Sequence, residues 1–186
     1  VGSSKTFLEI GIPSFIRGKV IKKPYLNLNT NLMGTAINLP LPFKKAKNEQ
    51  KELEFNFYPP FKKQTSKFDF RYGNLVRGKF NYPQDQLEGF LIAGKDKQTI
   101  SIEKGKISII GTLKNLDLAL FSLPSGLEKG VYPEFEIKKL EVDEILFSNF
   151  IFPKTFISSE NSEQYFGLNI SNDNISGKFF IPKNND

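Results

Sequence analysis

Apolar and polar residues alternate along most of this chain. The alternation is clearest at residues 25–32, where leucines at even positions follow asparagines at odd positions, and it returns at residues 52–57, 67–72, 134–138 and 166–170. A period of two is typical of β-strands with one apolar face and one hydrated face, as in antiparallel sheets. Turn residues between these segments, at 73–74, 83–85 and 172–174, favour hairpins. The pattern predicts an all-β, mainly antiparallel fold of about ten strands.

One segment has the pattern of a helix. Residues 116–123 follow an expected strand at 106–113, Asn115 or Asp117 is a suitable N-terminal cap, and Pro124 would end the helix. We therefore expect one short helix at Leu116–Leu123.

The alternation changes phase within residues 134–152. Apolar residues stand at odd positions at Phe135 and Ile137, and at even positions at Leu140 and Val142. Because a shift by one residue would move the side chains to the other face, the sequence predicts a bulge or turn near Lys138–Lys139.

Three short segments share a Gly-Lys-apolar core. They are residues 17–20, 77–80 and 176–179, and a proline follows each of them. Glycine within a strand marks a bulge, a bend or a close backbone approach. The three segments are either independent strand glycines or copies of a repeated β-unit that extends one sheet.

The amino-acid composition restricts the kinds of catalytic and metal-binding site that the chain can form. The chain has 186 residues, which is enough for one domain with its own core, and it contains no Cys, His or Trp. Thiolate nucleophiles, Ser-His relays and the usual zinc sites are thereby excluded, and only carboxylate chemistry with Lys or Tyr is left. We expect no enzyme activity, no catalytic residue, no metal and no cofactor.

The net charge is +6, with 26 Lys and Arg against 20 Asp and Glu. Such a balance suits an anionic partner, but the lysines are spread along the chain, so we favour a bias in genome composition. Aromatic and basic residues interleave at residues 58–68, as a single-stranded nucleic-acid surface requires. No RNA-binding motif accompanies them, and we expect no nucleic-acid partner.

Acidic residues cluster at residues 134–144. Glu134 and Glu136 would share one face of a strand, as a pair of glycosidase carboxylates would. They alternate with apolar residues and lie next to Lys138 and Lys139, which favours a solvated outer face.

Residues 34–55 include a rigid apolar elbow, Asn38-Leu39-Pro40-Leu41-Pro42-Phe43-Lys44-Lys45. The two prolines remove two backbone donors and hold an extended segment. This segment resembles the phrase G-L-x-x-x-L-P-x-P-L-x-K-P-A of the YhdP branch of the AsmA-like envelope proteins. Matching positions are Leu39, Pro40, Pro42 and Lys45, whereas Phe43 and Ala46 depart from the phrase.

Two further segments are similar to that family. Residues 107–118 resemble its V-S-G-x-L-P-x-L-D-L-D-x-W passage, with Gly111 and Asp117 in place and Phe121 where Trp is usual. Residues 175–182 resemble its strand endings. The three matches follow the family order along most of the chain.

The resemblance implies a fold, a location and a function. The fold is an elongated curved sheet that forms a segment of a β-taco groove. The expected parent is a periplasmic protein with an anchor in the bacterial inner membrane, and it carries phospholipid between the inner and outer membranes. Residues 1–186 would be a single β-rich segment excised from it. Its partners would be phospholipid acyl chains and neighbouring β-segments of the same parent chain, with the membrane anchor outside this fragment.

Alternating apolar residues are the expected lining of the groove. Phenylalanine (19 residues) far outnumbers tyrosine (6), as a surface for acyl chains requires. The candidates are Leu26, Leu28, Leu32, Phe55, Phe57, Phe68, Phe70, Phe80, Phe90, Ile92, Phe135, Ile137, Phe166, Leu168, Phe179 and Ile181. The same pattern also fits a closed structural or adhesive β-sandwich, and thirdly a basic nucleic-acid-binding module. We also expect the isolated fragment to associate through its sheet edges.

Overall fold

The computed structural model describes residues 3–84, 86–96, 98, 100–118 and 134–182. Within these residues the chain forms thirteen strands and no helix. The strands are β1 (Thr6–Gly11), β2 (Ser14–Ile16), β3 (Lys19–Lys22), β4 (Tyr25–Thr30), β5 (Leu53–Tyr58), β6 (Ser66–Tyr72), β7 (Val76–Tyr82), β8 (Glu88–Ala93), β9 (Lys106–Asp117), β10 (Glu134–Phe147), β11 (Phe150–Asn161), β12 (Tyr165–Ser171) and β13 (Ser176–Pro182).

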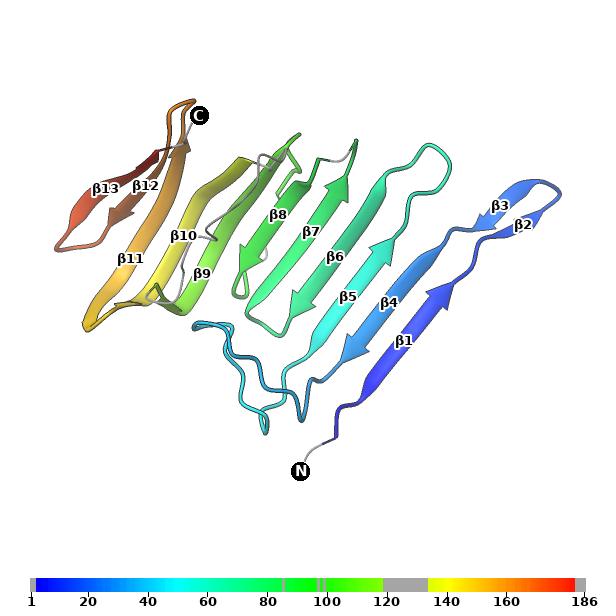
Figure 1. The fold of residues 1–186 in the computed structure, drawn as a ribbon, viewed down its shortest axis with the longest axis horizontal. Helices are drawn as coiled ribbons and strands as arrows, with labels where there is room; N and C mark the ends of the chain where they lie inside the picture. The colour runs from blue at the N-terminus through cyan, green and yellow to red at the C-terminus, as the bar shows by residue number, and fades with distance from the viewer. Residues whose placement is uncertain (1–2, 85, 97, 99, 119–133, 183–186) are drawn as a thin grey trace.

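Eleven of the strands form one sheet, in the order β1-β4-β5-β6-β7-β8-β9-β10-β11-β12-β13. All neighbours are antiparallel except β8–β9 and β9–β10, which are parallel. Parallel neighbours need longer connections than antiparallel ones. Residues 94–105 connect β8 to β9, and residues 118–133 connect β9 to β10. β2 and β3 form a separate hairpin that projects beyond one corner of the sheet (Figure 1). The expected all-β, mainly antiparallel architecture is confirmed.

The sheet is curved and does not close on itself (Figure 1). At about 4.8 Å between neighbouring strands, eleven strands span about 48 Å. In the described part of the chain, β1 and β13 each have a neighbour on one side only. None of the described residues belongs to a helix that is long and apolar enough to cross a membrane.

Local sequence signals set the turns. Residues 73–75 join β6 to β7 and residues 172–175 join β12 to β13, so the predicted turn residues at 73–74 and 172–174 lie in these hairpin connections. In the second turn, the Asn172 side-chain oxygen accepts hydrogen bonds from the backbone N–H groups of Asn174 and Ile175, at 2.9 and 2.8 Å. The bulge near Lys138–Lys139 is also confirmed, because the register between β9 and β10 shifts between Ile137 and Lys139.

The expected helix is wrong where the structure describes it. Leu116 and Asp117 belong to β9 and pair with Ile145 and Leu146 of β10. Residues 119–123, the remainder of that expected helix, lie outside the described residues. The ladder to β10 satisfies the backbone groups that a helix would otherwise satisfy within itself.

The three Gly-Lys segments are not copies of one unit. Gly18 occupies a hairpin turn with a positive φ of 74°. Gly78 lies within β7 under neighbouring side chains, whereas Gly177 is in β13 with open space beside it. These different settings support independent glycines.

The buried core lies where the sheet bends, around β8 to β11. Its fully or nearly buried members are Ala93, Leu113, Leu116, Leu140, Val142, Ile145 and Ile157. Because this cluster does not include the strands from β1 to β7, those strands depend on cross-strand packing within one layer, where Tyr72 and Phe80 are the buried apolar residues among those described.

Candidate functional site

The register of the sheet places most of the sequence-predicted lining residues on one face, here called the apolar face. Paired residues of neighbouring strands point to the same side, so the pairing can be followed from strand to strand. One row of this face runs across seven strands through Leu26, Phe57, Phe68, Phe80, Gly89, Ile107 and Phe135. A second, parallel row runs through Leu28, Phe55, Phe70, Gly78, Leu91, Ile109 and Ile137.

The apolar face continues beyond the bend. Leu140 pairs with Ile157, which pairs with Ile170 of β12. On the same face, Leu168 pairs with Phe179, and the backbone of Phe166 pairs with that of Ile181. The predicted lining residues Phe166, Leu168 and Phe179 therefore share the face with those of β4 to β7.

Phenylalanine rings cover the centre of the apolar face. The rings of Phe68 and Phe80 stack with centroids 4.8 Å apart, and Phe70 lies parallel to Phe80 at 6.2 Å. Phe55 adds a tilted contact with Phe68 at 6.1 Å. The two glycines of the rows make room for these rings, since a Cβ at Gly78 would lie 2.6 Å from the Phe80 ring. The rings thus form a packed layer on the sheet.

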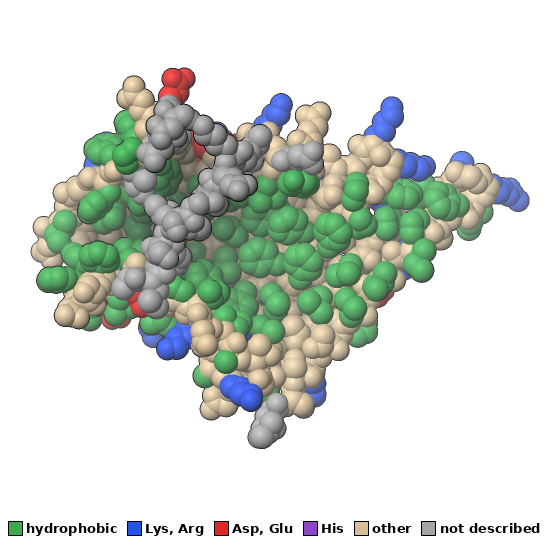
Figure 2. Space-filling view, viewed as in Figure 1, with side chains coloured by type: hydrophobic (Ala, Val, Ile, Leu, Met, Phe, Trp, Pro, Cys, Tyr) green, Lys and Arg blue, Asp and Glu red, His purple; other side chains and the backbone are tan. Residues whose placement is uncertain are grey.

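This layer remains partly exposed to solvent. Phe80 is 5% exposed, but Phe55, Phe57, Phe68 and Phe70 are only half-buried. Hydrophobic side chains gather in a continuous field across the middle of this face, with Lys and Arg mainly at its periphery (Figure 2). Among the described residues no second sheet packs on it.

The opposite face of β4 to β7 is polar. Asn56 donates to the Asp69 carboxylate at 2.7 Å, and Arg71 forms a bidentate pair with Glu54. The hydrogen bond and the charge of Glu54 raise the pKa of Arg71 above its ordinary value. The sheet therefore has one apolar and one hydrated face, as the alternation predicts.

Two predicted lining residues lie on that opposite face. Phe90 pairs with Lys79 and Ile92 pairs with Arg77, so the expectation that they share the apolar face is wrong. Ile92 is 1% exposed beside the segment that follows β8, where Arg77 donates to the carbonyl of Asp96 at 2.8 Å. Every residue from Phe90 to Ala93 is apolar, so alternation did not identify the face.

Leu32 also lies away from the apolar face. It follows the end of β4 with a positive φ of 49°, and its N–H donates to the Thr30 hydroxyl at 3.2 Å. This turn takes the chain out of the sheet, which the continued alternation at residues 25–32 did not reveal.

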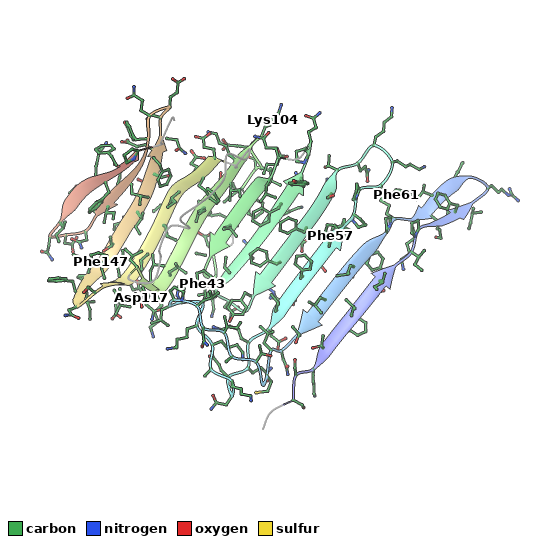
Figure 3. All side chains as sticks on the ribbon, viewed as in Figure 1. Phe43, Phe57, Phe61, Lys104, Asp117 and Phe147 are labelled. Carbon is green, nitrogen blue, oxygen red and sulfur yellow. The ribbon has the colours of Figure 1, made fainter. Side chains whose placement is uncertain are left out.

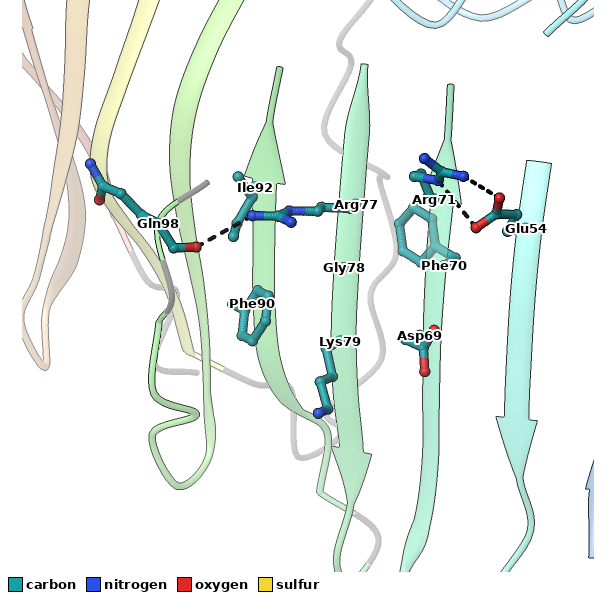
Figure 4. Close-up of a pocket in the computed structure, with 10 residues that line it drawn as sticks. All are labelled: Glu54, Asp69, Phe70, Arg71, Arg77, Gly78, Lys79, Phe90, Ile92 and Gln98. Atoms are coloured by element: carbon teal, nitrogen blue, oxygen red, sulfur yellow. Dashed lines mark hydrogen bonds and ion pairs between the residues drawn. The ribbon is translucent and has the colours of Figure 1, made fainter. Parts of the chain in front are cut away.

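An open hollow of about 460 Å³ lies on the polar face. It is lined by residues of β5 to β8, including the Arg71–Glu54 pair, and by Gln98, whose carbonyl accepts from Arg77 at 3.3 Å (Figure 4). Four of its charged groups, Glu54, Asp69, Arg71 and Arg77, already bond to protein atoms, and we assign it no chemistry. Within the described segments no cluster of acidic residues is arranged to hold a metal ion.

The acidic cluster of β10 lies in ion pairs and hydrogen bonds. Glu134 faces Lys106 at 3.9 Å, and Glu136 faces Lys138 at 3.7 Å and accepts from Ser108 at 3.4 Å. Lys138 also pairs with Glu103, which lowers the pKa of that carboxyl and raises the pKa of Lys138.

The segment that resembles the YhdP phrase belongs to the connection between β4 and β5. Leu39 is exposed, the Pro40 carbonyl accepts from the N–H of Phe43 at 2.8 Å, and Pro42 and Lys45 are buried. Gly111 lies within β9 with a φ of 122°, and a Cβ there would collide with the Ala93 backbone.

Several residues of the apolar face were not predicted. They are Leu8, Ile10, Leu91, Ile107, Ile109, Leu140, Val142 and Ile157. Leu8 and Ile10 alternate with Glu9, and Leu140 and Val142 alternate with Glu141 and Asp143, so alternation offered a signal for four of them.

Comparison with known proteins adds no assignment. A scan against models of protein families, a search of curated proteins and a search of solved structures each returned no match.

Proposed function

We propose that this chain is a groove-forming segment of a bridge-like lipid transport protein, and that phospholipids move along its apolar face between the inner and outer membranes. The observation that carries the proposal is the pair of apolar rows that crosses seven strands and whose side chains on β4 to β6 remain partly exposed to solvent. The resemblance to the YhdP branch of the AsmA-like proteins points to the same function and to the periplasm. No catalytic step is required.

The dimensions of the face suit acyl chains. Strands of six or seven residues, as in β4 to β8, are about 20–23 Å long. One leaflet of a bilayer contributes about 15 Å of hydrocarbon. An acyl chain that lies along the strands would therefore fit on the face, with its headgroup in water beyond the strand ends. Movement across the strands would then carry the lipid along the sheet.

The hydrophobic effect supplies the binding free energy. Each methylene kept out of water contributes about 0.8 kcal/mol, so an uninterrupted face keeps the free energy of the lipid nearly constant along the path. A charged side chain within the rows would interrupt it, because an unpaired carboxylate beside an acyl chain is costly to desolvate.

Aspartate substitutions at Phe57 and Phe70 test the proposal. The parent protein with either substitution should show at least a tenfold loss of crosslinking to a photoactivatable phospholipid, as expected for a charge placed against hydrocarbon. Tyr58→Asp is the matched control, since Tyr58 is exposed on the opposite face of the same strand. Circular dichroism would check that all three variants fold. Crosslinking that is unchanged in Phe57→Asp and Phe70→Asp would contradict the proposal.

A structural or adhesive β-domain is the second candidate. The buried core on β8 to β11, where Val142 has no exposed surface, favours a structural role for that part of the sheet. A purely structural domain would bind neither phospholipid nor a small apolar dye. Enhanced fluorescence of anilinonaphthalene sulfonate that is lost in Phe70→Asp would favour the groove.

A further inference from the structure

The β2–β3 hairpin exposes apolar side chains that the sheet does not use. The hairpin projects from the corner where β1 ends and β4 begins (Figure 1). Ile12, Phe15, Ile16 and Ile21 are exposed by 76, 56, 61 and 61%. Four large apolar side chains exposed on a projecting hairpin and its flank indicate a contact surface, because exposed apolar residues are normally scattered singly.

The same corner is strongly basic. The chain contains no acidic residue between Glu9 and Glu49, and the hairpin and its flank carry Arg17, Lys19, Lys22 and Lys23. The neighbouring connection between β5 and β6, residues 59–65, adds Lys62 and Lys63 and again no acidic residue.

Two contacts join the hairpin to that connection. The Lys23 ammonium donates to the Gln64 side-chain oxygen at 3.0 Å, and the rings of Phe15 and Phe61 lie 6.3 Å apart. Phe61 is placed between the hairpin and the ends of the central strands (Figure 3). We call residues 12–23 together with residues 59–65 the basic corner.

A hollow beside the basic corner has the charge to receive an anionic group. It measures about 460 Å³ and is lined in part by Lys23, Lys67 and Lys79, with Asp69 as its acidic member. The Asp69 carboxylate already accepts a hydrogen bond from Asn56 at 2.7 Å. The hollow thus keeps an excess of positive charge.

We propose that the basic corner docks on the surface of an anionic lipid bilayer. Its lysines and arginine would contact headgroup phosphates, and the aliphatic side chains of the hairpin would enter the boundary between headgroups and acyl chains. The positive charge of the corner favours an anionic partner. The exposed isoleucines favour a partner that has a hydrocarbon layer beneath its charged surface. A nucleic acid would engage the lysines but leave those isoleucines in water. This inference does not depend on lipid transport along the apolar face.

Vesicle flotation with the whole chain tests the inference. The chain should float with phosphatidylcholine vesicles that contain phosphatidylglycerol, and much less with pure phosphatidylcholine. The variant R17Q/K19Q/K62Q/K63Q should bind the anionic vesicles more weakly by about fivefold for each cation removed. The variant I16S/I21S should lose about tenfold while keeping its net charge.

Matched controls separate the corner from the rest of the molecule. K44Q/K47Q/K95Q/K114Q removes the same charge from exposed positions outside the basic corner, and it should bind anionic vesicles far more tightly than R17Q/K19Q/K62Q/K63Q, because each corner cation is expected to contribute about fivefold. The groove variant F57D/F70D should keep vesicle binding, so failure of docking and failure of transport are distinguishable.

Three results would overturn the docking proposal. One is equal loss in the two quadruple variants, which would indicate net charge alone. Another is displacement by inorganic phosphate, which would indicate a site for a free anion. The third is tighter binding to a single-stranded oligonucleotide than to anionic vesicles, with I16S/I21S unaffected in both assays.

Discussion

The backbone N–H of Asp117 donates a hydrogen bond to the carbonyl of Leu41 at 3.0 Å. This bond joins the end of β9 to the connection between β4 and β5, residues 31–52. The Tyr72 hydroxyl adds a bond to the carbonyl of Phe43 at 3.3 Å. Phe43 and Asp117 accordingly lie close together at the ends of the strands (Figure 3). The connection therefore covers one margin of the apolar face, and the two longest segments that resemble the YhdP branch meet there.

Lys45 holds this connection together, and its removal should destabilise the protein. The Lys45 side chain is 1% exposed, and its ammonium donates to the carbonyls of Thr35 and Ala46 at 2.7 and 3.0 Å. Lys45→Ala would remove both hydrogen bonds and leave a cavity in place of the buried side chain, which costs about 2–4 kcal/mol. Urea unfolding measures the change. The neighbouring Lys44 is exposed, so Lys44→Ala should stay within about 0.5 kcal/mol of the wild type; equal losses in the two variants would contradict this role.

Gly78 and Gly177 should respond in opposite ways to alanine. A Cβ at Gly78 would lie 2.6 Å from the Phe80 ring and 2.9 Å from both Leu91 and Phe70, whereas nothing lies within 4 Å of a Cβ at Gly177. Gly78→Ala should cost about 1–3 kcal/mol by overpacking. Gly177→Ala should be neutral or stabilise by up to about 1 kcal/mol, because alanine restricts the unfolded chain. Thermal unfolding of the two variants, made in strands of the same sheet, checks both signs.

Alternation identified the faces wherever one face is hydrated. Leu26 and Leu28 are separated by asparagine, and Phe68 and Phe70 by aspartate, so only one side of each strand is apolar. The bulge at Lys138–Lys139 was equally readable, because the phase of the apolar positions changes there. Alternation did not reveal whether the apolar face is open or sealed, since both arrangements require the same two-residue period.

Alternation does not identify the faces of the parallel strands. β8 has parallel β9 on one side, and β9 lies between two parallel neighbours, where both faces are largely buried and apolar residues run without alternation. Phe90 and Ile92 were misassigned for this reason. The expected helix failed because the leucines at 116 and 118 also fit a strand, and pairing with β10 overrides a weak local preference.

Tyr72 should make the stability of the protein fall at high pH. Burial, followed by the charge of Glu49, raises the pKa of its hydroxyl above the ordinary value of 10.0. A group with a raised pKa in the folded state stabilises that state below its unfolded pKa, and the contribution is lost as pH rises through the folded pKa. Tyr72→Phe should cost about 0.5–1.5 kcal/mol at neutral pH, through loss of the bond to Phe43, and should show a smaller loss above pH 10.

Urea midpoints at neutral pH and above pH 10 measure this difference. Tyr82→Phe is the control, because it removes a hydroxyl from an exposed strand end. A high-pH loss in Tyr72→Phe as large as that of the wild type would show that other groups cause it.

The free edges of the sheet should make this chain associate with itself. β1 and β13 each have one unpaired side among the described residues, and Leu8, Ile10, Phe179 and Phe180 are exposed on them. Unpaired N–H and C=O groups on a flat apolar strand form a template for another strand. We expect concentration-dependent oligomers in sedimentation velocity. Ile10→Lys, which places a charge on the β1 edge, should weaken the association at least tenfold, since an ammonium opposed to an apolar strand is costly to desolvate.

Leu39→Lys is the matched control for the edge prediction. Leu39 is an exposed leucine in the connection between β4 and β5, away from both edge strands, so its replacement makes the same change in charge without touching an edge. Association that persists in Leu39→Lys and weakens in Ile10→Lys would locate the contact at β1. A wild-type chain that stays monomeric at high concentration would instead mean that its edges are protected, and that neighbouring β-segments are not needed to complete the sheet.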